Sequence, residues 1–175
     1  MFYVAAQIMV WTFIIQYADR LGIDKATAQK FNIAAMALFL TSRFISTYLM
    51  QYISSRKLLM FFGLGACLTT LGTILIQGMG GLYCLVATSA FMSLMFPTIY
   101  GIALEDVKAE DTTLGAAFLV MAIVGGAVIP PLQGAIIDLG TIGSMPAVNL
   151  SFALPLLCFA IVALYGWSAV KAGRK

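Results

Sequence analysis

The sequence contains no histidine, and this absence excludes several kinds of site. A histidine-ligated haem, a histidine-ligated zinc ion and a serine–histidine triad each require an imidazole group. The three cysteines, Cys67, Cys84 and Cys158, lie within apolar runs and lack the spacing of metal ligands. We interpret them as small apolar residues packed between helices, and we expect no metal and no cofactor.

Charged residues are also scarce, at 10% of the 175 residues against about 25% in an average soluble domain. Hydrophobic residues make up 62% of the chain. Such a sequence cannot cover a surface that faces water, so we expect it to fold in a lipid bilayer. The net charge is +3, and the basic residues lie at the ends of apolar segments rather than on one face, which argues against nucleic-acid binding.

Motifs for several kinds of chemistry are missing as well. No G-x-x-x-x-G-K-[ST] phosphate-binding loop occurs, so we do not expect the chain to hydrolyse ATP. No nucleophile–base pair stands out, which argues against an enzyme. The only acid within an apolar stretch is Asp138, close to the outer end of that stretch. A proton-driven transporter usually needs a carboxylate deep in the membrane, and this chain offers no obvious one.

What the chain does contain is a series of long apolar stretches. A helix needs about 20 apolar residues to cross a hydrocarbon core of about 30 Å. Six stretches qualify, at residues 1–18, 31–53, 58–77, 82–104, 114–139 and 148–170. We therefore predict an all-α membrane protein in which residues 1–175 form one domain of six transmembrane helices. The first stretch begins at Met1 without a polar flank, which favours a truncated or split product of a longer gene.

The segments between these stretches predict an orientation, because Lys and Arg favour the cytoplasmic side of a membrane. One side holds Arg56, Lys57, Lys108, Lys171, Arg174 and Lys175, and the other holds Arg20, Lys25 and Lys30. We predict a multi-pass protein with both termini in the cytoplasm.

Arg43 is a charge near the middle of the second stretch. Such a charge costs at least about 2.5–3.5 kcal/mol on insertion scales, so it should face the protein interior or a water-filled cavity. Two roles are open: a gating or ligand-binding charge, and a structural charge paired with a carboxylate or with backbone carbonyls. The structural role is favoured, with Glu105 or Asp106 as the first partner to test.

Polar and aromatic side chains of the first stretch could line a cavity. Tyr3, Gln7 and Trp11 are spaced four apart and therefore lie on one helix face. An amide beside a flat indole ring suits a sugar, which has hydroxyl rims and apolar C–H faces. Candidates to extend this wall from the second and fourth stretches are Phe39, Phe96 and Tyr100. For any one aromatic residue, plain packing against lipid or core is the competing interpretation.

Prolines and glycines interrupt two of the stretches. Pro97 lies in the fourth stretch, and in the fifth Gly125 and Gly126 precede Pro130 and Pro131. Proline removes an N–H donor, which membrane helices tolerate when neighbours satisfy the freed carbonyl. Paired glycines allow helices to approach closely. These residues suit helices that bend or rock, although static bundles also contain them.

The same segments resemble those of a known family. Phe91–Tyr100, which reads FMSLMFPTIY, and Asp111–Gly134, which contains VGGAVIPPLQG, resemble the tenth and eleventh helices of L-fucose–proton symporters. Phe2–Trp11 resembles the seventh helix of that family, and the Arg43–Phe44 pair resembles a pair in its eighth. The family belongs to the fucose–galactose–glucose branch of the major facilitator superfamily.

The resemblance implies a twelve-helix transporter of the bacterial inner membrane, with two six-helix domains around a central sugar site and alternating access. This chain would be helices seven to twelve, the C-terminal half, with the N-terminal half missing. The partners implied are a sugar, a proton, the lipid bilayer and that first half. In the family, the first domain holds the proton-coupling carboxylates and most polar sugar contacts. The second supplies an apolar wall, here mapped to Phe39 and Phe96 with Gln7 and Trp11.

Two questions stay open on the sequence alone. L-Fucose is the default sugar by resemblance, while galactose, glucose or an amino sugar are alternatives. A six-span membrane scaffold or assembly subunit without transport activity is the alternative function, because the deep acid is missing and the aromatic residues have ordinary packing explanations.

Overall fold

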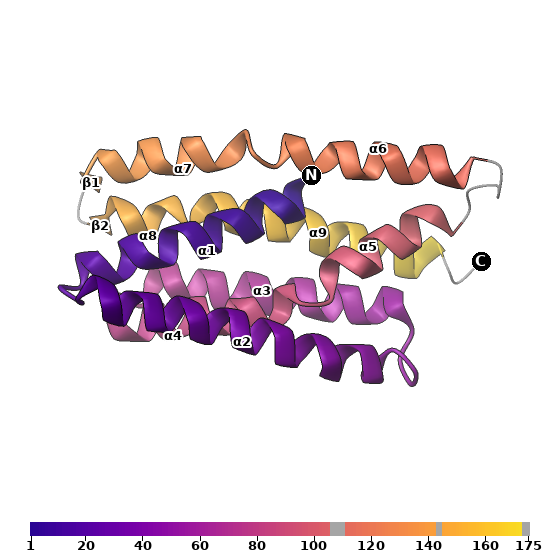
Figure 1. Ribbon diagram of the computed structural model, residues 1–175, viewed down its shortest axis with the longest axis horizontal. Helices are drawn as coiled ribbons and strands as arrows, with labels where there is room; N and C mark the ends of the chain where they lie inside the picture. The colour runs from indigo at the N-terminus through magenta and orange to yellow at the C-terminus, as the bar shows by residue number, and fades with distance from the viewer. Residues whose placement is uncertain (106–110, 143–144, 173–175) are drawn as a thin grey trace.

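The computed structural model describes residues 1–105, 111–142 and 145–172, and within these ranges the chain is almost entirely helical. The helices are α1 (Phe2–Arg20), α2 (Lys25–Leu49), α3 (Ser55–Leu75), α4 (Met79–Met92), α5 (Met95–Leu104), α6 (Thr112–Gly125), α7 (Ile129–Asp138), α8 (Ala147–Ser151) and α9 (Ala153–Ala172). The long helices run side by side along the long axis of the molecule (Figure 1). After α7, β1 (Thr141–Ile142) pairs antiparallel with β2 (Met145–Pro146).

The last three apolar stretches are broken helices rather than continuous ones. The breaks lie at residues 93–94 between α4 and α5, at 126–128 between α6 and α7, and at Phe152 between α8 and α9. A proline is the third residue of each following helix, namely Pro97, Pro131 and Pro155. Each proline lacks the N–H that would bond to the carbonyl four residues earlier, so the regular helix ends there. The first two breaks lie just before prolines noted in the sequence, and the third was not predicted.

Length and composition single out three helical units that can cross a membrane among the described residues. These are Ser55–Leu75, Met79–Leu104 and Ala147–Ala172, and Thr112–Met121 is a shorter apolar helix. The helices α1 and α2 carry amide or charged side chains within their length, including Gln7 and Arg43. Polar residues in a membrane helix normally face the protein interior or a cavity. This difference separates α1 and α2 from the more uniformly apolar helices.

Helices α3 and α9 pack closely because small residues line their contact. A Cβ atom added to Gly63 would lie 2.9 Å from the Cα atom of Ala163, and one added to Gly166 would lie 3.0 Å from the main-chain nitrogen of Met60. In lipid, helix association depends on such close van der Waals packing. Large apolar side chains such as Leu59 and Phe159 fill the core beside this contact.

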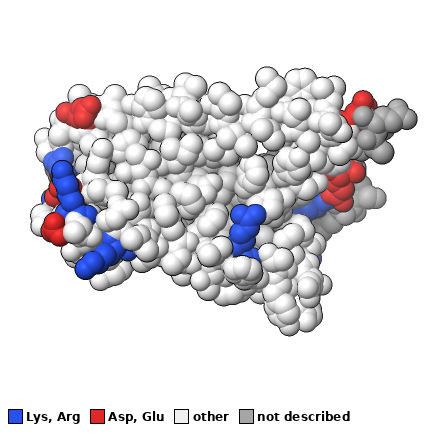
Figure 2. Space-filling model, viewed as in Figure 1, with Lys and Arg blue, Asp and Glu red and all other residues white. Residues whose placement is uncertain are grey.

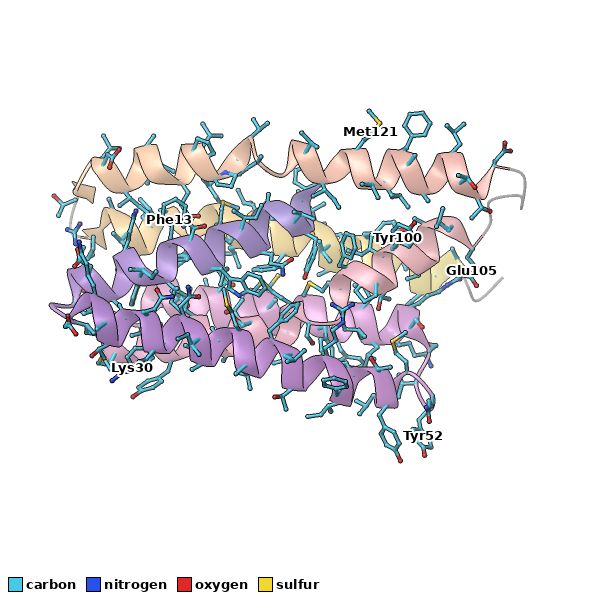
Figure 3. The ribbon with its side chains drawn as sticks, viewed as in Figure 1. Phe13, Lys30, Tyr52, Tyr100, Glu105 and Met121 are labelled. Carbon is cyan, nitrogen blue, oxygen red and sulfur yellow. The ribbon has the colours of Figure 1, made fainter. Side chains whose placement is uncertain are left out.

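Charges on the visible face gather mainly near the two ends of the bundle, with one basic group between them (Figure 2). Lys30 and Glu105 mark opposite ends, and Met121 projects from α6 away from the other helices (Figure 3). Lys30 belongs to the less basic side predicted from the sequence. Arg56, which forms an ion pair with Glu105, belongs to the more basic side. Lys108, Arg174 and Lys175 of the predicted cytoplasmic side lie outside the described residues.

Candidate functional site

Trp11 of α1 and Phe39 of α2 form an aromatic pair. Their ring centroids lie 5.1 Å apart with an interplanar angle of 81°, an edge-to-face arrangement that aromatic rings favour. The indole Nε1 of Trp11 donates a hydrogen bond of 3.4 Å to the Ser89 hydroxyl on α4. Both rings are half-buried, so part of each remains accessible. Two residues predicted for one wall therefore do meet, although they lie 28 residues apart in the chain.

Gln7 lies one helical turn from Trp11 on the same face of α1. Its side chain is half-buried, and within the described residues it has no hydrogen-bond partner. A primary amide carries two donor hydrogens and a carbonyl acceptor. Gln7 therefore presents a complete donor–acceptor set beside an aromatic pair.

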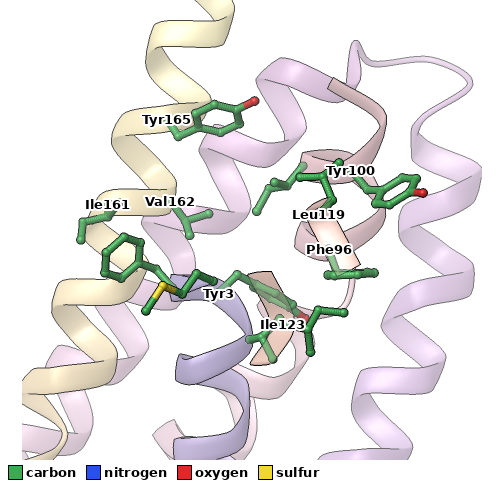
Figure 4. A pocket seen from close by; sticks show the side chains of 12 residues that line it. Tyr3, Phe96, Tyr100, Leu119, Ile123, Ile161, Val162 and Tyr165 are labelled. Atoms are coloured by element: carbon green, nitrogen blue, oxygen red, sulfur yellow. The ribbon is translucent and has the colours of Figure 1, made fainter. Parts of the chain in front are cut away.

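Phe96 and Tyr100 belong to a second aromatic group. The Phe96 ring lies 6.1 Å from the Tyr3 ring and 6.2 Å from the Tyr100 ring, centroid to centroid. These residues line an apolar pocket of about 220 Å³ between α1, α5, α6 and α9 (Figure 4). Other labelled lining residues are Leu119, Ile123, Ile161, Val162 and Tyr165. Trp11, Phe39 and Gln7 do not line this pocket, so the predicted wall is divided into two groups.

Side chains of neighbouring helices donate hydrogen bonds to two carbonyls next to the break between α4 and α5. The Tyr3 hydroxyl donates a hydrogen bond of 2.9 Å to the carbonyl of Met92. The Ser42 hydroxyl donates one of 2.9 Å to the carbonyl of Ala90 and accepts one of 3.2 Å from the Ser93 hydroxyl. Carbonyls at a helix break in lipid need such donors. Tyr3 and Ser42 were not predicted from the sequence as donors at this break.

The break between α6 and α7 lies against α1. Gly126 is buried, and an added Cβ atom would lie 3.1 Å from the main-chain nitrogen of Ala5. Gly125 is the last residue of α6, and Pro130 lies in the first turn of α7, where a missing N–H costs no helical hydrogen bond. The small residue at position 126 thus permits close approach of α1, and a gating role for this region stays a prediction.

Arg43 does not have the partner expected from the sequence. The carboxylate of Glu105 instead forms an ion pair of 2.7 Å with Arg56, at the start of α3. Asp106, the other expected partner, lies outside the described residues. Arg43 is exposed on α2, and within the described residues no carboxylate lies within ion-pair distance of its guanidinium. Glu105, one of the two partners to test first, is therefore not the partner of Arg43, because α5 carries its C-terminal end towards the start of α3 rather than towards the middle of α2.

A buried polar cluster was missed in the sequence. The Asn149 amide of α8 donates hydrogen bonds of 3.2 Å to the Tyr17 hydroxyl and 3.0 Å to the Thr73 carbonyl. The Tyr17 hydroxyl in turn lies 3.3 Å from the Gly78 carbonyl. These contacts join α1, α3 and α8 beside a pocket of about 270 Å³. The signal was available, because an amide within an apolar stretch is the feature that singled out Gln7.

The chain is similar in sequence to several sugar transporters. No family model matches the chain. It is 62% identical to the L-fucose-proton symporter of Haemophilus influenzae, over 97% of this chain and 40% of that protein. It is 32% identical to the L-fucose-proton symporter of Escherichia coli K12, over 93% of this chain and 36% of that protein. It is also 32% identical to a glucose/galactose transporter of Brucella abortus, over 97% and 40% of the two chains.

A solved structure matches as well. The major facilitator superfamily transporter FucP, in the outward conformation, superposes with a TM-score of 0.89 at 29% sequence identity, over 96% of this chain and 40% of that one. The chain thus spans about 40% of the length of the relatives that it matches. Over nearly its whole length, this chain is similar to part of two proteins named as L-fucose-proton symporters and to part of the major facilitator superfamily transporter FucP.

Proposed function

We propose that the chain is the second six-helix half of a sugar–proton symporter, with L-fucose or a related hexose as its sugar. The observation that carries this proposal is the 62% identity, over 97% of the chain, to a protein named as an L-fucose-proton symporter. The six predicted spans and the single domain of residues 1–175 belong to the proposal, as do the inner-membrane location and the cytoplasmic termini. The scaffold alternative is not favoured, because the relatives are transporters.

In this proposal, the sugar lies against the face of α1 that carries Gln7 and Trp11. The apolar C–H face of a hexose packs on the Trp11–Phe39 pair. The Gln7 amide, which has no hydrogen-bond partner within the described residues, bonds to a hydroxyl group of the sugar. Phe96 and Tyr100 lie in the separate apolar pocket, so they contribute through the packing of α5 against α1. Arg43 is exposed and has no ion-pair partner in the described part of the chain, so it is available as a gating or ligand-binding charge.

Proton coupling is assigned to the other half. The acids of α1, Asp19, and of α7, Asp138, lie at helix ends rather than deep in the bundle. A carboxylate that takes up a proton within the membrane must lie where its charge is partly desolvated. The missing N-terminal six-helix half would therefore supply that carboxylate. The broken helices α4–α5 and α6–α7 would bend as the two halves rock around the sugar.

The test is uptake of labelled sugar into vesicles that contain the chain together with a matching first half. A pH gradient should drive uptake of L-fucose, galactose or glucose, and a protonophore that collapses the gradient should abolish accumulation. Vesicles with either half alone serve as controls and should not accumulate sugar. Correctly inserted halves that take up no hexose or deoxyhexose would overturn the proposal.

A further inference from the structure

We propose that Ser89 is a positioning residue that holds the Trp11 ring for sugar binding; this inference rests on the proposed function. Ser89 lies on α4 and is fully buried, so it does not itself face the accessible side of the bundle. Its hydroxyl lies 3.4 Å from the Trp11 Nε1 atom and accepts the indole hydrogen. Nothing in the sequence pattern singled out this serine.

The hydrogen bond of the Ser89 hydroxyl differs from one that four threonines of this bundle make. Thr41, Thr47, Thr73 and Thr88 each donate a hydrogen bond to the carbonyl four residues earlier in their own helix. That is the common way for a hydroxyl in a helix to be satisfied. Within the described residues, the recorded hydrogen bond of Ser89 instead crosses to α1. The contact therefore joins two helices at the one indole N–H of the predicted wall.

Ser89 and Phe39 restrain the Trp11 ring from two different helices. The N–H edge of the indole is held from α4, and the Phe39 ring packs at 81° to it from α2. A ring held at two points has less rotational freedom to lose when a sugar packs on it, which lowers the cost of binding. Removal of the Ser89 hydroxyl should leave the ring in place but less restrained, and should leave the indole N–H without its acceptor.

The experiment uses the assembled transporter of both halves, labelled with [15N]tryptophan, and the variants Ser89→Ala and Ser89→Thr. The indole N–H resonance of Trp11 is assigned by its absence in Trp11→Phe. In Ser89→Ala we expect an upfield shift and broadening of that resonance, and a KM for L-fucose uptake raised about threefold with kcat little changed. Ser89→Thr keeps the hydroxyl and should restore both readouts towards the original values.

Ser46→Ala is the matched control, because Ser46 is a buried serine whose hydroxyl has no hydrogen-bond partner among the described residues. It should change neither the resonance nor KM. An unchanged resonance in Ser89→Ala, or the same change in Ser46→Ala, would overturn the proposal. A shifted resonance with an unchanged KM would overturn the role in sugar binding. Absence of uptake by the unsubstituted transporter would contradict the proposed function itself, and the resonance would still decide whether Ser89 holds the ring.

Discussion

The hydroxyl of Tyr3 donates a 2.9 Å hydrogen bond to the main-chain carbonyl of Met92, 89 residues further along the chain. Met92 is the last residue of α4, so the bond supplies a donor at the point where the helix breaks before Pro97. The first helix of the chain thereby stabilises an irregularity in the fourth apolar stretch. Both residues are buried, so water does not offer a substitute donor in this conformation.

Tyr3→Phe should therefore destabilise the fold through the Met92 carbonyl. The substitution keeps the ring and its contact with Phe96 but removes the hydroxyl donor. We expect a loss of about 1 kcal/mol in the free energy of unfolding, at the low end for a buried acceptor left unpaired. Unfolding by SDS in mixed micelles measures it. Tyr48→Phe is the control, since that hydroxyl is exposed and bonds to Tyr52, and it should have almost no effect. Equal losses in the two variants would contradict this account of the break.

Gly63→Ala should weaken the packing of α3 on α9. The added Cβ would lie 2.9 Å from the Ala163 Cα atom, and a backbone atom cannot move aside as a flexible side chain can. The helices must therefore separate, at a cost of about 1–3 kcal/mol. Thermal unfolding in detergent should show a lower melting temperature for Gly63→Ala. Gly101→Ala is the matched control, because a Cβ atom added there meets no other atom within 4 Å. A Gly63→Ala protein as stable as the control would show that this contact tolerates a wider spacing.

Arg43→Gln should impair transport more than folding. Arg43 is exposed, and in the described part of the chain no carboxylate pairs with it, so its removal breaks no ion pair observed there. We expect near-normal folded yield in membranes and a turnover at least several-fold lower. Glu105→Gln is a useful comparison, since the Glu105 side chain is 56% exposed and a surface ion pair contributes about 0–1 kcal/mol. Normal turnover in Arg43→Gln would remove the basis for a gating or ligand-binding charge.

Trp11→Ala and Phe96→Ala should separate the two aromatic groups. Trp11 lies one helical turn from Gln7 on α1, whereas Phe96 lies in the apolar pocket between α1, α5, α6 and α9. Loss of the indole should raise the KM for sugar about tenfold with little loss of folded yield. Loss of the Phe96 ring should lower folded yield at least as much as it weakens sugar affinity. The test is to measure uptake kinetics and folded yield in the same membranes. Equal losses of yield and affinity in Trp11→Ala would show that the indole contributes to packing rather than to sugar recognition.

The sequence by itself determined the class of protein and the places where its helices fail. Scarce charge and long apolar runs require a lipid environment, and in lipid a chain must form helices, because each backbone group has to be satisfied internally. The break before Pro97 was readable because a proline removes a donor from its own helix. Pro155 carries the same signal, so the break at Phe152 was equally readable and was overlooked.

Only the tertiary structure decided which residues meet across helices. Spacing placed Gln7 and Trp11 on one face of α1, but it contains no information on the rotation of α2, α4 or α5 about their axes. In the folded chain, Trp11 contacts Phe39 and Ser89, whereas Phe96 lines a separate pocket. Glu105 forms its ion pair with Arg56 and not with Arg43. Helix periodicity is a local property, whereas these pairings depend on how small residues such as Gly63 and Gly126 let whole helices approach.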